Sequence, residues 1–505
     1  MKRFLSRSAR RLRAPAAWLA VVVSIGAAAP EAWAHGAKNV IVMIADGAGF
    51  NAYDAASMYE GKWDLARNKS TQVYDGPGWV KYACTTYPLN SSKKPTGDRV
   101  QEAELIYRPE LAWDATPLTD KDARTYFFAG YRFLMREATD SAAAATAIAT
   151  GEKTFDAAIN WSNTNRAIRG RTLAEIAKKQ GKAVGVVTTV QWSHATPACL
   201  GGAHSIFRDD NEAIANEMLH ARYLDVIMGA GHPEFDDDGR PAAKPACFVG
   251  GARTWDLLKS GNHPRGWRLI QTKAQFEALA DGSGFVGLKV LGVAQVHTTL
   301  QQKRGGYQSG NVPFAVPPNG NVPSLRTMVQ GALSVLESDP DGFYLAIEGG
   351  AVDWANHERQ PARMIEEQID FNRAVEAVVR WVETHSHWNE TLLVVTADHE
   401  TGMVWGENSD KIAFQPLAFR QEGKLPGLRH ETLDPKDKAR HTNSLVPLYV
   451  RGVWSQSFAQ RGHGTDTTAQ KRWHVQGRYV DNTDIFAVAR ECLEAEPAPV
   501  PSPAR

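Results

Sequence analysis

The chain has 505 residues, of which 43% are hydrophobic and 22% charged, a composition that excludes a disordered, collagen-like or coiled-coil protein. Lys and Arg number 57 and Asp and Glu 56, so the net charge is +1. Residues 1–34 contain six of the basic residues and one acidic residue, which leaves the rest of the chain with a net charge of −4. A mildly acidic body argues against nucleic acid as the partner, because proteins bind phosphate backbones with an excess of Lys and Arg.

The first 34 residues have the pattern of an export signal. A basic stretch reaches Arg13, an apolar stretch covers residues 14–29, and Ala-Trp-Ala at 32–34 has the small-x-small pattern of a cleavage site. The apolar stretch is shorter than the ~20 residues that a spanning helix needs, which disfavours a membrane anchor. We therefore expect a signal peptide over 1–34 and an exported mature chain, periplasmic or secreted, without a membrane span. The pattern does not choose between Sec and twin-arginine export.

Strand and helix patterns alternate along the mature chain. β-Branched runs predict buried strands at 39–45, 183–190, 343–347 and 391–396. Helices are predicted from the capping box at Thr172 to Gly181 and, by apolar spacing, between Ala362 and His385. This alternation predicts an α/β fold, a three-layer α/β/α sandwich with a large, mostly parallel central sheet. A further run at 445–450 follows His441 and makes the sheet mixed if His441 lies at the same edge as the other candidate ligands.

Three stretches interrupt this pattern. Residues 89–130 and 403–440 are polar and read as inserted loops, and 275–330 reads as an insertion or a small subdomain. We expect one catalytic domain over 35–493 and a disordered, Pro-rich tail over 494–505.

The cysteines leave two alternatives open. The chain contains Cys84, Cys199, Cys247 and Cys492, and no two of them have C-x-x-C spacing. An even count in an oxidising compartment predicts up to two disulfides, with three possible pairings. Buried free thiols are the alternative.

Metal-ligand residue types stand at the carboxyl ends of the predicted strands, where parallel sheets gather their chemistry. The first strand leads to Asp46 and the third to Glu348. The second strand leads to the Ser-His-Ala-Thr stretch with His194 and Thr196, and the fourth to the pair Asp398-His399. One such coincidence is common, but four together indicate a metal site.

Two further motifs add candidate groups. Asp353 and His357 are spaced i,i+4, which places them on one helix face, as a shared metal requires. Ser141 opens an alanine-rich helix, with Asp140 near its N-cap and Gly151 at its end. Ser141 is a first-turn residue, the cap itself, or a nucleophile at a helix N-terminus, where an anion is favoured. The chain has no G-x-S-x-G elbow, so a nucleophilic serine here needs activation by a metal such as Zn²⁺.

These motifs together resemble the alkaline phosphatase family. The resemblance rests on six stretches in one order from residue 39 to about 452: NVIVMIADGAG, TDSAAAATAIATG, HATP, EGGAVDWANH, TADHETG and HTNSLVPLY. The stretch VDNTDIF at 480–486 resembles the family's C-terminal region. The match covers nearly the whole mature chain.

The resemblance implies a role for each matching residue. Ser141 would be the nucleophile that becomes phosphorylated, and Arg208 would clamp the phosphate. One zinc ion would be bound by Asp353, His357 and His441. A second zinc ion, beside Ser141, would be bound by Asp46, Asp398 and His399. Asp46 would bridge to a third metal, usually Mg²⁺, held with Thr196 and Glu348. His194 stands where some relatives have aspartate, which suggests that another metal can replace magnesium.

The implied function is the metal-dependent hydrolysis of phosphate monoesters through a phosphoserine on Ser141, with small-molecule phosphomonoesters as substrates. A phosphodiesterase on the same scaffold and an exported phosphate- or metal-binding protein without turnover are the alternatives. The family also suggests a homodimer.

Overall fold

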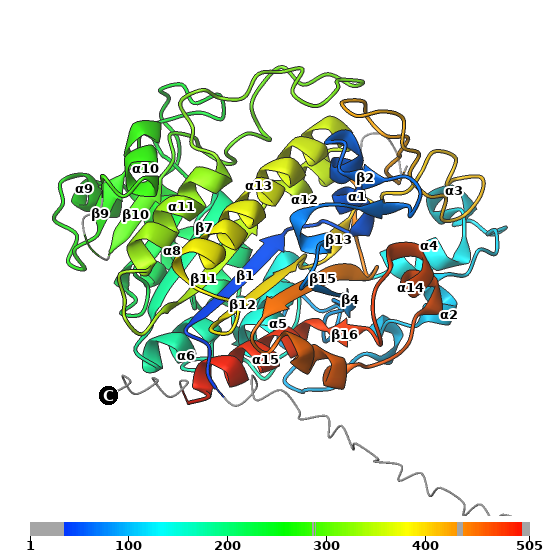
Figure 1. Ribbon diagram of the computed structural model, residues 1–505, viewed down its shortest axis with the longest axis horizontal. Helices are drawn as coiled ribbons and strands as arrows, with labels where there is room; N and C mark the ends of the chain where they lie inside the picture. The colour runs from blue at the N-terminus through cyan, green and yellow to red at the C-terminus, as the bar shows by residue number, and fades with distance from the viewer. Residues whose placement is uncertain (1–34, 285–286, 288, 432–437, 497–505) are drawn as a thin grey trace, which may run out of the picture. The chain divides into compact units, whose positions relative to one another are not determined.

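The computed structural model describes residues 35–284, 287, 289–431 and 438–496 (Figure 1). The predicted export signal of residues 1–34 lies outside the described residues, and so do residues 497–505 of the tail predicted over 494–505; both stay predictions. Of the other tail residues, Glu494 is the last residue of a helix. The described residues belong to one unit by their internal contacts.

A ten-stranded sheet runs through the described part of the chain. In spatial order it consists of β16 (Val480–Asp481), β4 (Val80–Thr85), β15 (Val446–Gly452), β12 (Thr391–Thr396), β1 (Asn39–Ala45), β11 (Phe343–Gly349), β7 (Ala183–Gln191), β8 (Val226–Ala230), β10 (Val290–Val293) and β9 (Arg268–Ile270). Only β15 runs against its neighbours, β12 and β4, and the other pairs are parallel. The sheet is therefore mostly parallel and mixed, as predicted.

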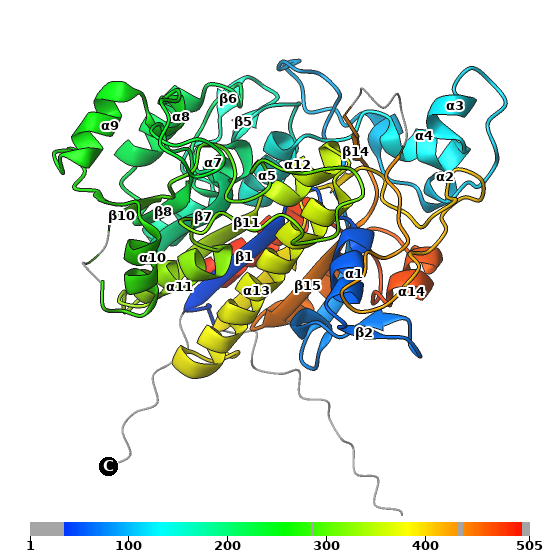
Figure 2. The same cartoon turned by 90° about the horizontal axis from the view of Figure 1, so that it is seen from above.

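Helices cover both faces of this sheet, which confirms the α/β fold and its three layers. One layer contains α1 (Phe50–Tyr59), α10 (Lys273–Ala280), α11 (Leu325–Leu336) and α13 (Pro361–His385). The other contains α5 (Ser141–Thr150), α6 (Leu173–Lys179), α7 (Ala195–Leu200) and α15 (Asn482–Glu494). Figure 2 shows α11 and α13 on one side of β1 and β11, and α5 and α7 on the other. Every residue of β1 and β11 is buried, as expected of strands covered on both faces.

The remaining elements are short and lie around the sheet. They are the helices α2 (Pro109–Ala112), α3 (Ala123–Tyr126), α4 (Ala129–Met135), α8 (Asn211–His220), α9 (Ala252–Lys259), α12 (Ala351–His357) and α14 (Thr467–Trp473). Three two-stranded ladders pair β2 (Trp63–Asp64) with β3 (Lys69–Ser70), β5 (Trp161–Ser162) with β6 (Arg166–Ala167), and β13 (Glu400–Thr401) with β14 (His441–Thr442).

The three interrupting stretches differ in what they contribute. Residues 89–130 and 403–440 supply no strand to the ten-stranded sheet within the described residues, and they pack against each other. Their contact is aromatic, with the ring of Trp113 4.9 Å from that of Phe414 and 5.9 Å from that of Trp405. The stretch 275–330 instead supplies β10 to the sheet. This strand is four residues long, too short for its pattern to stand out in the sequence.

The expectation of disulfides is wrong for this structure. All four cysteines lie in the described residues and all are free. Cys84 lies in β4, Cys199 in α7 and Cys492 in α15, and these three are buried, so they pack as small apolar side chains.

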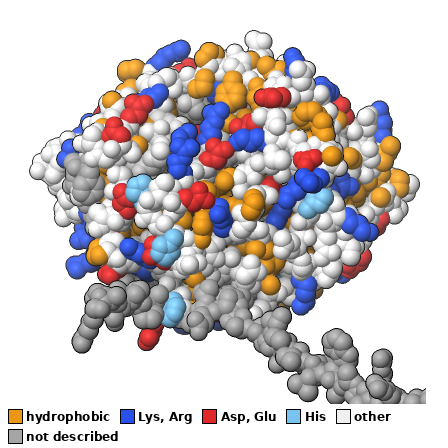
Figure 3. Space-filling view, in the orientation of Figure 1, with side chains coloured by type: hydrophobic (Ala, Val, Ile, Leu, Met, Phe, Trp, Pro, Cys, Tyr) orange, Lys and Arg blue, Asp and Glu red, His pale blue; other side chains and the backbone are white. Residues whose placement is uncertain are grey.

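Charges are mixed on the surface. On the face shown in Figure 3, Lys and Arg side chains alternate with Asp and Glu side chains instead of gathering by sign. Among the described residues, no helix is both long enough and apolar enough to cross a membrane.

Candidate active site

The predicted ligands converge at the carboxyl edge of the sheet. β1 leads to Asp46, β12 leads to Asp398 and His399, and Glu348 lies at the end of β11. These residues, together with His194, Asp353 and His441, form three groups whose ligand atoms lie within 4.8 Å of one another: Asp353, His399 and His441; Asp46, Asp398 and His399; and Asp46, His194 and Glu348. The gathering predicted from four strand ends is therefore present. We call the predicted ligand sets site 1 (Asp353, His357, His441), site 2 (Asp46, Asp398, His399) and site 3 (Asp46, His194, Thr196, Glu348).

Site 1 is built on α12 and β14. His357 Nε2 lies 3.2 Å from Asp353 Oδ2 and 2.9 Å from His441 Nε2, and His441 Nε2 lies 3.5 Å from Asp353 Oδ1. Ligand atoms at ~2.0–2.2 Å from a tetrahedral zinc ion are separated by roughly 3.3–3.5 Å. The two separations that involve Asp353 are close to this spacing, whereas the two imidazole nitrogens lie closer together, so the set fits such an ion once the two rings move slightly apart. The i,i+4 spacing on α12 produces the close approach of Asp353 and His357.

Backbone carbonyls fix the orientation of both site 1 histidines. His357 Nδ1 donates to Ala439 O at 2.5 Å, and His441 Nδ1 donates to Thr139 O at 2.8 Å. Both Nε2 atoms are thereby directed at site 1. Burial disfavours a charge on His441, but the hydrogen bond and charge of Asp353 outweigh it and raise the pKa of His441 to about 9. A metal that binds at site 1 must therefore displace this proton.

Site 2 adjoins the candidate nucleophile. His399 Nε2 lies 3.3 Å from Asp398 Oδ2 and 3.6 Å from Asp46 Oδ1. The same nitrogen lies 3.3 Å from Ser141 Oγ. These separations also match the tetrahedral spacing, with the serine oxygen as the fourth group.

Site 3 concentrates carboxylates in the interior. Neither oxygen of Asp46 has a hydrogen-bond partner among the described residues, and Glu348 accepts from Thr188 Oγ1. Burial, with the nearby charge of Asp398, raises the pKa of Asp46 well above its ordinary value. Burial likewise raises the pKa of Glu348 to about 8. A bound cation would relieve both the burial cost and the mutual repulsion, so the donor set fits a metal ion.

Ser141 is the first residue of α5, and its neighbour caps the helix. Asp140 Oδ1 accepts from Ala143 N at 2.9 Å, and the helix ends at Gly151, whose φ of 72° is a left-handed cap. Ser141 is buried and lies at the positive end of the helix dipole, beside site 2. The predicted helix and its two caps are thus present.

Arg208 reaches the same place from the loop after α7. Its Nη1 donates to Asp140 Oδ2 at 2.8 Å and its Nη2 donates to His194 Nε2 at 3.2 Å. Burial works against both charges, but the ion pair outweighs it, so that the pKa of Asp140 falls and that of Arg208 rises. The pair links the capping residue of α5 to the candidate phosphate clamp.

His194 contacts both Arg208 and Trp354, and the sequence indicated neither contact. Burial and the charge of Arg208 lower the pKa of His194 to about 3, so its ring is neutral and Nε2 accepts from Arg208. The ring also lies edge-on to Trp354, with centroids 5.9 Å apart. His194 therefore belongs to the predicted ligand set of site 3 and also contacts Arg208, the candidate phosphate clamp.

Three contacts at the site were missed by sequence reasoning. They are the Asp140–Arg208 ion pair, the bond from Thr188 to Glu348, and a bond from Thr401 Oγ1 to Asp353 Oδ1 at 2.5 Å. Each joins residues from 48 to 160 positions apart, and no periodicity links such positions. Of these contacts, only the one made by Thr401 had a signal in the sequence, because Thr401 lies in the motif TADHETG.

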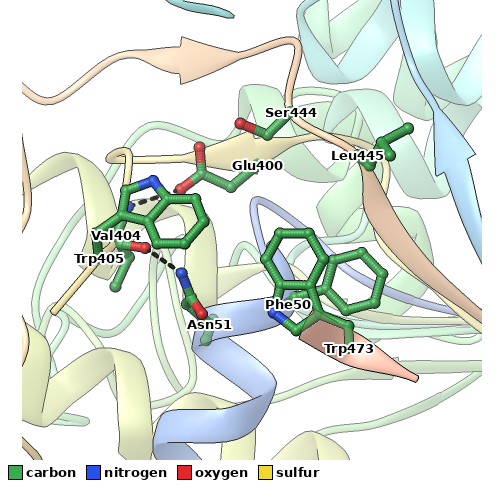
Figure 4. A pocket seen from close by; sticks show the side chains of 10 residues that line it. Phe50, Asn51, Glu400, Val404, Trp405, Ser444, Leu445 and Trp473 are labelled. Carbon is green, nitrogen blue, oxygen red and sulfur yellow. Dashed lines mark hydrogen bonds between the residues drawn. The ribbon is translucent and has the colours of Figure 1, made fainter. Parts of the chain in front are cut away.

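A small aromatic pocket lies beside the turn that follows His399. Figure 4 shows Phe50 stacked on Trp473, with Glu400, Val404 and Trp405 around them. The ring centroids of Phe50 and Trp473 are 4.2 Å apart and the rings are nearly parallel. The space inside, about 20 Å³, is close to what one water molecule needs, so the pocket does not accommodate a substrate group.

Comparisons with known proteins identify the family of the chain. The alkaline phosphatase family model matches residues 111–479. Alkaline phosphatase 3 of Bacillus subtilis (strain 168) is 30% identical over 373 residues, which are 72% of this chain and 61% of that protein. Alkaline phosphatase H of Pseudomonas aeruginosa (strain UCBPP-PA14) is 28% identical over 389 residues, which are 70% of this chain and 73% of that protein. The chain belongs to the alkaline phosphatase family.

Solved structures show the same fold. The cold-active alkaline phosphatase from the psychrophile Shewanella sp. superposes with a TM-score of 0.57 at 21% identity, over 90% of this chain and 99% of that one. A TAB5 alkaline phosphatase in which one histidine is replaced by aspartate, with Mg bound in the M3 site, superposes with a TM-score of 0.55 at 20% identity, over 92% of this chain and 99% of that one. The match to the Bacillus relative spans less than two thirds of that protein's length.

Proposed function

We propose that the protein hydrolyses phosphate monoesters and that Ser141 is its nucleophile. The observation that carries the proposal is the position of Ser141 Oγ, 3.3 Å from His399 Nε2 of site 2 and next in sequence to Asp140, which holds Arg208. A nucleophile, an anion clamp and metal-ligand sets therefore meet at one helix N-terminus. A binding protein without turnover would not need the serine.

The residues divide the reaction between them. Arg208 donates to two non-bridging phosphate oxygens, as the planar guanidinium fork allows, while Asp140 keeps the fork in place. The backbone N–H groups at the start of α5 favour the anionic phosphoryl group. Ser141 Oγ loses its proton and bonds to phosphorus as the bond to the leaving oxygen breaks, and that oxygen takes up a proton to become the alcohol. Water then cleaves the phosphoserine, which releases inorganic phosphate and restores the serine hydroxyl. Zinc ions in sites 1 and 2 and a third metal, usually magnesium, in site 3 would supply charge stabilisation of the attacking and leaving oxygens.

The chemistry of the ligands supports this choice of metals. Sites 1 and 2 combine imidazole nitrogen with carboxylate oxygen, which suits zinc, and site 3 offers mainly oxygen, which suits magnesium. In the TAB5 variant with Mg bound in the M3 site an aspartate replaces a histidine, whereas site 3 of this chain contains His194. A ring nitrogen suits zinc better than magnesium, so another metal could replace magnesium in site 3.

The test is the hydrolysis of p-nitrophenyl phosphate by the purified protein before and after chelation, with bis-p-nitrophenyl phosphate as the diester. We expect monoester turnover that chelation removes and zinc with magnesium restores, and a much slower reaction on the diester. Faster turnover of the diester would support a phosphodiesterase instead. No turnover of either ester by the zinc-loaded protein would contradict the proposal.

A further inference from the structure

One buried hydroxyl contacts a ligand from each of the two proposed zinc sites. Thr401 Oγ1 lies 2.5 Å from Asp353 Oδ1 of site 1 and 3.3 Å from His399 Nδ1 of site 2. Thr401 has no exposed surface, so water does not substitute for these bonds. Thr401 is not one of the predicted metal ligands.

The chemistry of the two partners fixes the direction of both bonds. A carboxylate only accepts, so the Thr401 hydroxyl donates its proton to Asp353. The hydroxyl oxygen is then left as an acceptor, and the donor within reach is His399 Nδ1–H. The proton of the neutral His399 ring is thereby placed on Nδ1, and the lone pair of Nε2 faces Asp398, Asp46 and Ser141.

The backbone places Thr401 within reach of both Asp353 and His399. Thr401 pairs with His441 in the β13–β14 ladder, and its N–H donates to Gly47 O at 3.0 Å, next to Asp46. Successive side chains of a strand point to opposite faces. Glu400 points into the aromatic pocket of Figure 4, where it accepts from Val404 N, and Thr401 points the other way, towards the ligands.

The site 1 histidines are oriented differently. The acceptors for His357 and His441 are backbone carbonyls, which no side-chain substitution removes. The acceptor for His399 is the Thr401 side chain, so this orientation depends on one residue type. Loss of the hydroxyl would leave Asp353 without that donor and His399 free to place its proton on Nε2, where it would block site 2.

We propose that Thr401 is a positioning residue that couples the two zinc sites, because its hydroxyl orients Asp353 in site 1 and His399 in site 2. The inference rests on the proposed function, since it takes zinc as the metal of these sites. Replacing the hydroxyl by a methyl group should weaken zinc binding at both sites together, by about 10- to 100-fold, the range typical of lost outer-shell hydrogen bonds.

The experiment compares zinc affinity in four proteins: wild type, Thr401→Val, Thr401→Ser and Thr442→Val. Thr442 is the matched control, because it lies in the partner strand of the same ladder and is equally buried, but its hydroxyl donates to Glu400 at 2.5 Å instead of to a ligand. Each protein is stripped of metal, and zinc is returned in competition with a chelator of known affinity. Circular dichroism of the metal-free proteins checks folding, and Thr401→Ala replaces the valine variant if that variant does not fold.

We expect Thr401→Val to bind two zinc ions more weakly, while Thr401→Ser and Thr442→Val stay close to wild type. Equal weakening in Thr442→Val would mean that any change in the ladder has this effect, and equal weakening in Thr401→Ser would mean that the methyl group matters; either result would overturn the inference. Unchanged affinity in Thr401→Val would overturn it as well. If wild type itself binds no zinc, the proposed function fails and not this inference alone.

Discussion

Removal of the Arg208 guanidinium tests the proposed phosphate clamp. Two of its five N–H donors are already bonded, one to Asp140 Oδ2 at 2.8 Å and one to His194 Nε2 at 3.2 Å, which leaves three for phosphate oxygens. A hydrogen bond to a charged group contributes about 1.5–3 kcal/mol, and two such bonds partly replaced by water leave a net loss of about 2–4 kcal/mol in Arg208→Ala. That is roughly a 30- to 1,000-fold loss in kcat/KM and in affinity for inorganic phosphate.

The assay measures inhibition of monoester hydrolysis by inorganic phosphate, alongside zinc content. Arg208→Ala should keep its zinc, because Arg208 is not a ligand. Asp140→Asn keeps a good helix cap but removes the charge that holds Arg208, so its effect should be smaller and should vanish in the Arg208→Ala background. Additive effects of the two substitutions, or an unchanged inhibition constant in Arg208→Ala, would refute the role of the pair.

Three further substitutions give independent tests. Ser141→Ala should abolish turnover while both zinc ions stay bound, because the serine is one group beside site 2; loss of zinc, measured by elemental analysis, would make Ser141 a structural ligand. His194→Asp should bind Mg²⁺ more tightly than wild type in a titration of the zinc-loaded protein, since it adds a negative charge to site 3; equal affinities would remove His194 from that site. Burial, with the charges of Asp370 and Glu366, raises the pKa of Glu367 to about 8, so the folded protein loses stability as pH rises from about 4.5 to 8. The free energy of unfolding of Glu367→Gln should therefore exceed that of wild type by a few kcal/mol at pH 9, which thermal denaturation would show as a higher melting temperature, with no such gain at pH 4.5.

The central strands could be predicted because both of their faces are buried. Residues 39–45 and 391–396 are continuous apolar runs, and the structure places β1 and β12 at those bounds. Some strands away from the centre of the sheet were missed because they contain polar residues that contacts in the folded chain bury. β4 contains Lys81, which reads as polar, but its Nζ lies 3.3 Å from Asp75 Oδ1 and 5.0 Å from the ring of Tyr449, so the lysine is buried as an ion pair.

The candidate site, like the sheet, has features that the sequence predicts and features that it does not. Candidate ligands follow from residue identity and from the rule that strand ends meet at one edge, so the convergence of Asp46, Glu348, Asp398 and His399 could be predicted from the sequence. Contacts that orient these ligands could not, because Thr401 and Asp353 are 48 positions apart and meet only in the folded chain. The expectation of disulfides was wrong for the same reason, because the spacing of cysteines along the chain does not show that they lie in separate elements of the fold.

The phosphoserine is the central claim, and a rapid acid quench tests it most directly. The metal-loaded protein is mixed with a phosphate monoester, quenched in acid during turnover, digested and analysed by mass spectrometry. The account predicts one phosphorylated peptide, with the phosphate on Ser141, and its absence from chelated protein and from Ser141→Ala. Phosphate on another residue, or turnover of the monoester with Ser141 unmodified at every quench time, would contradict the account.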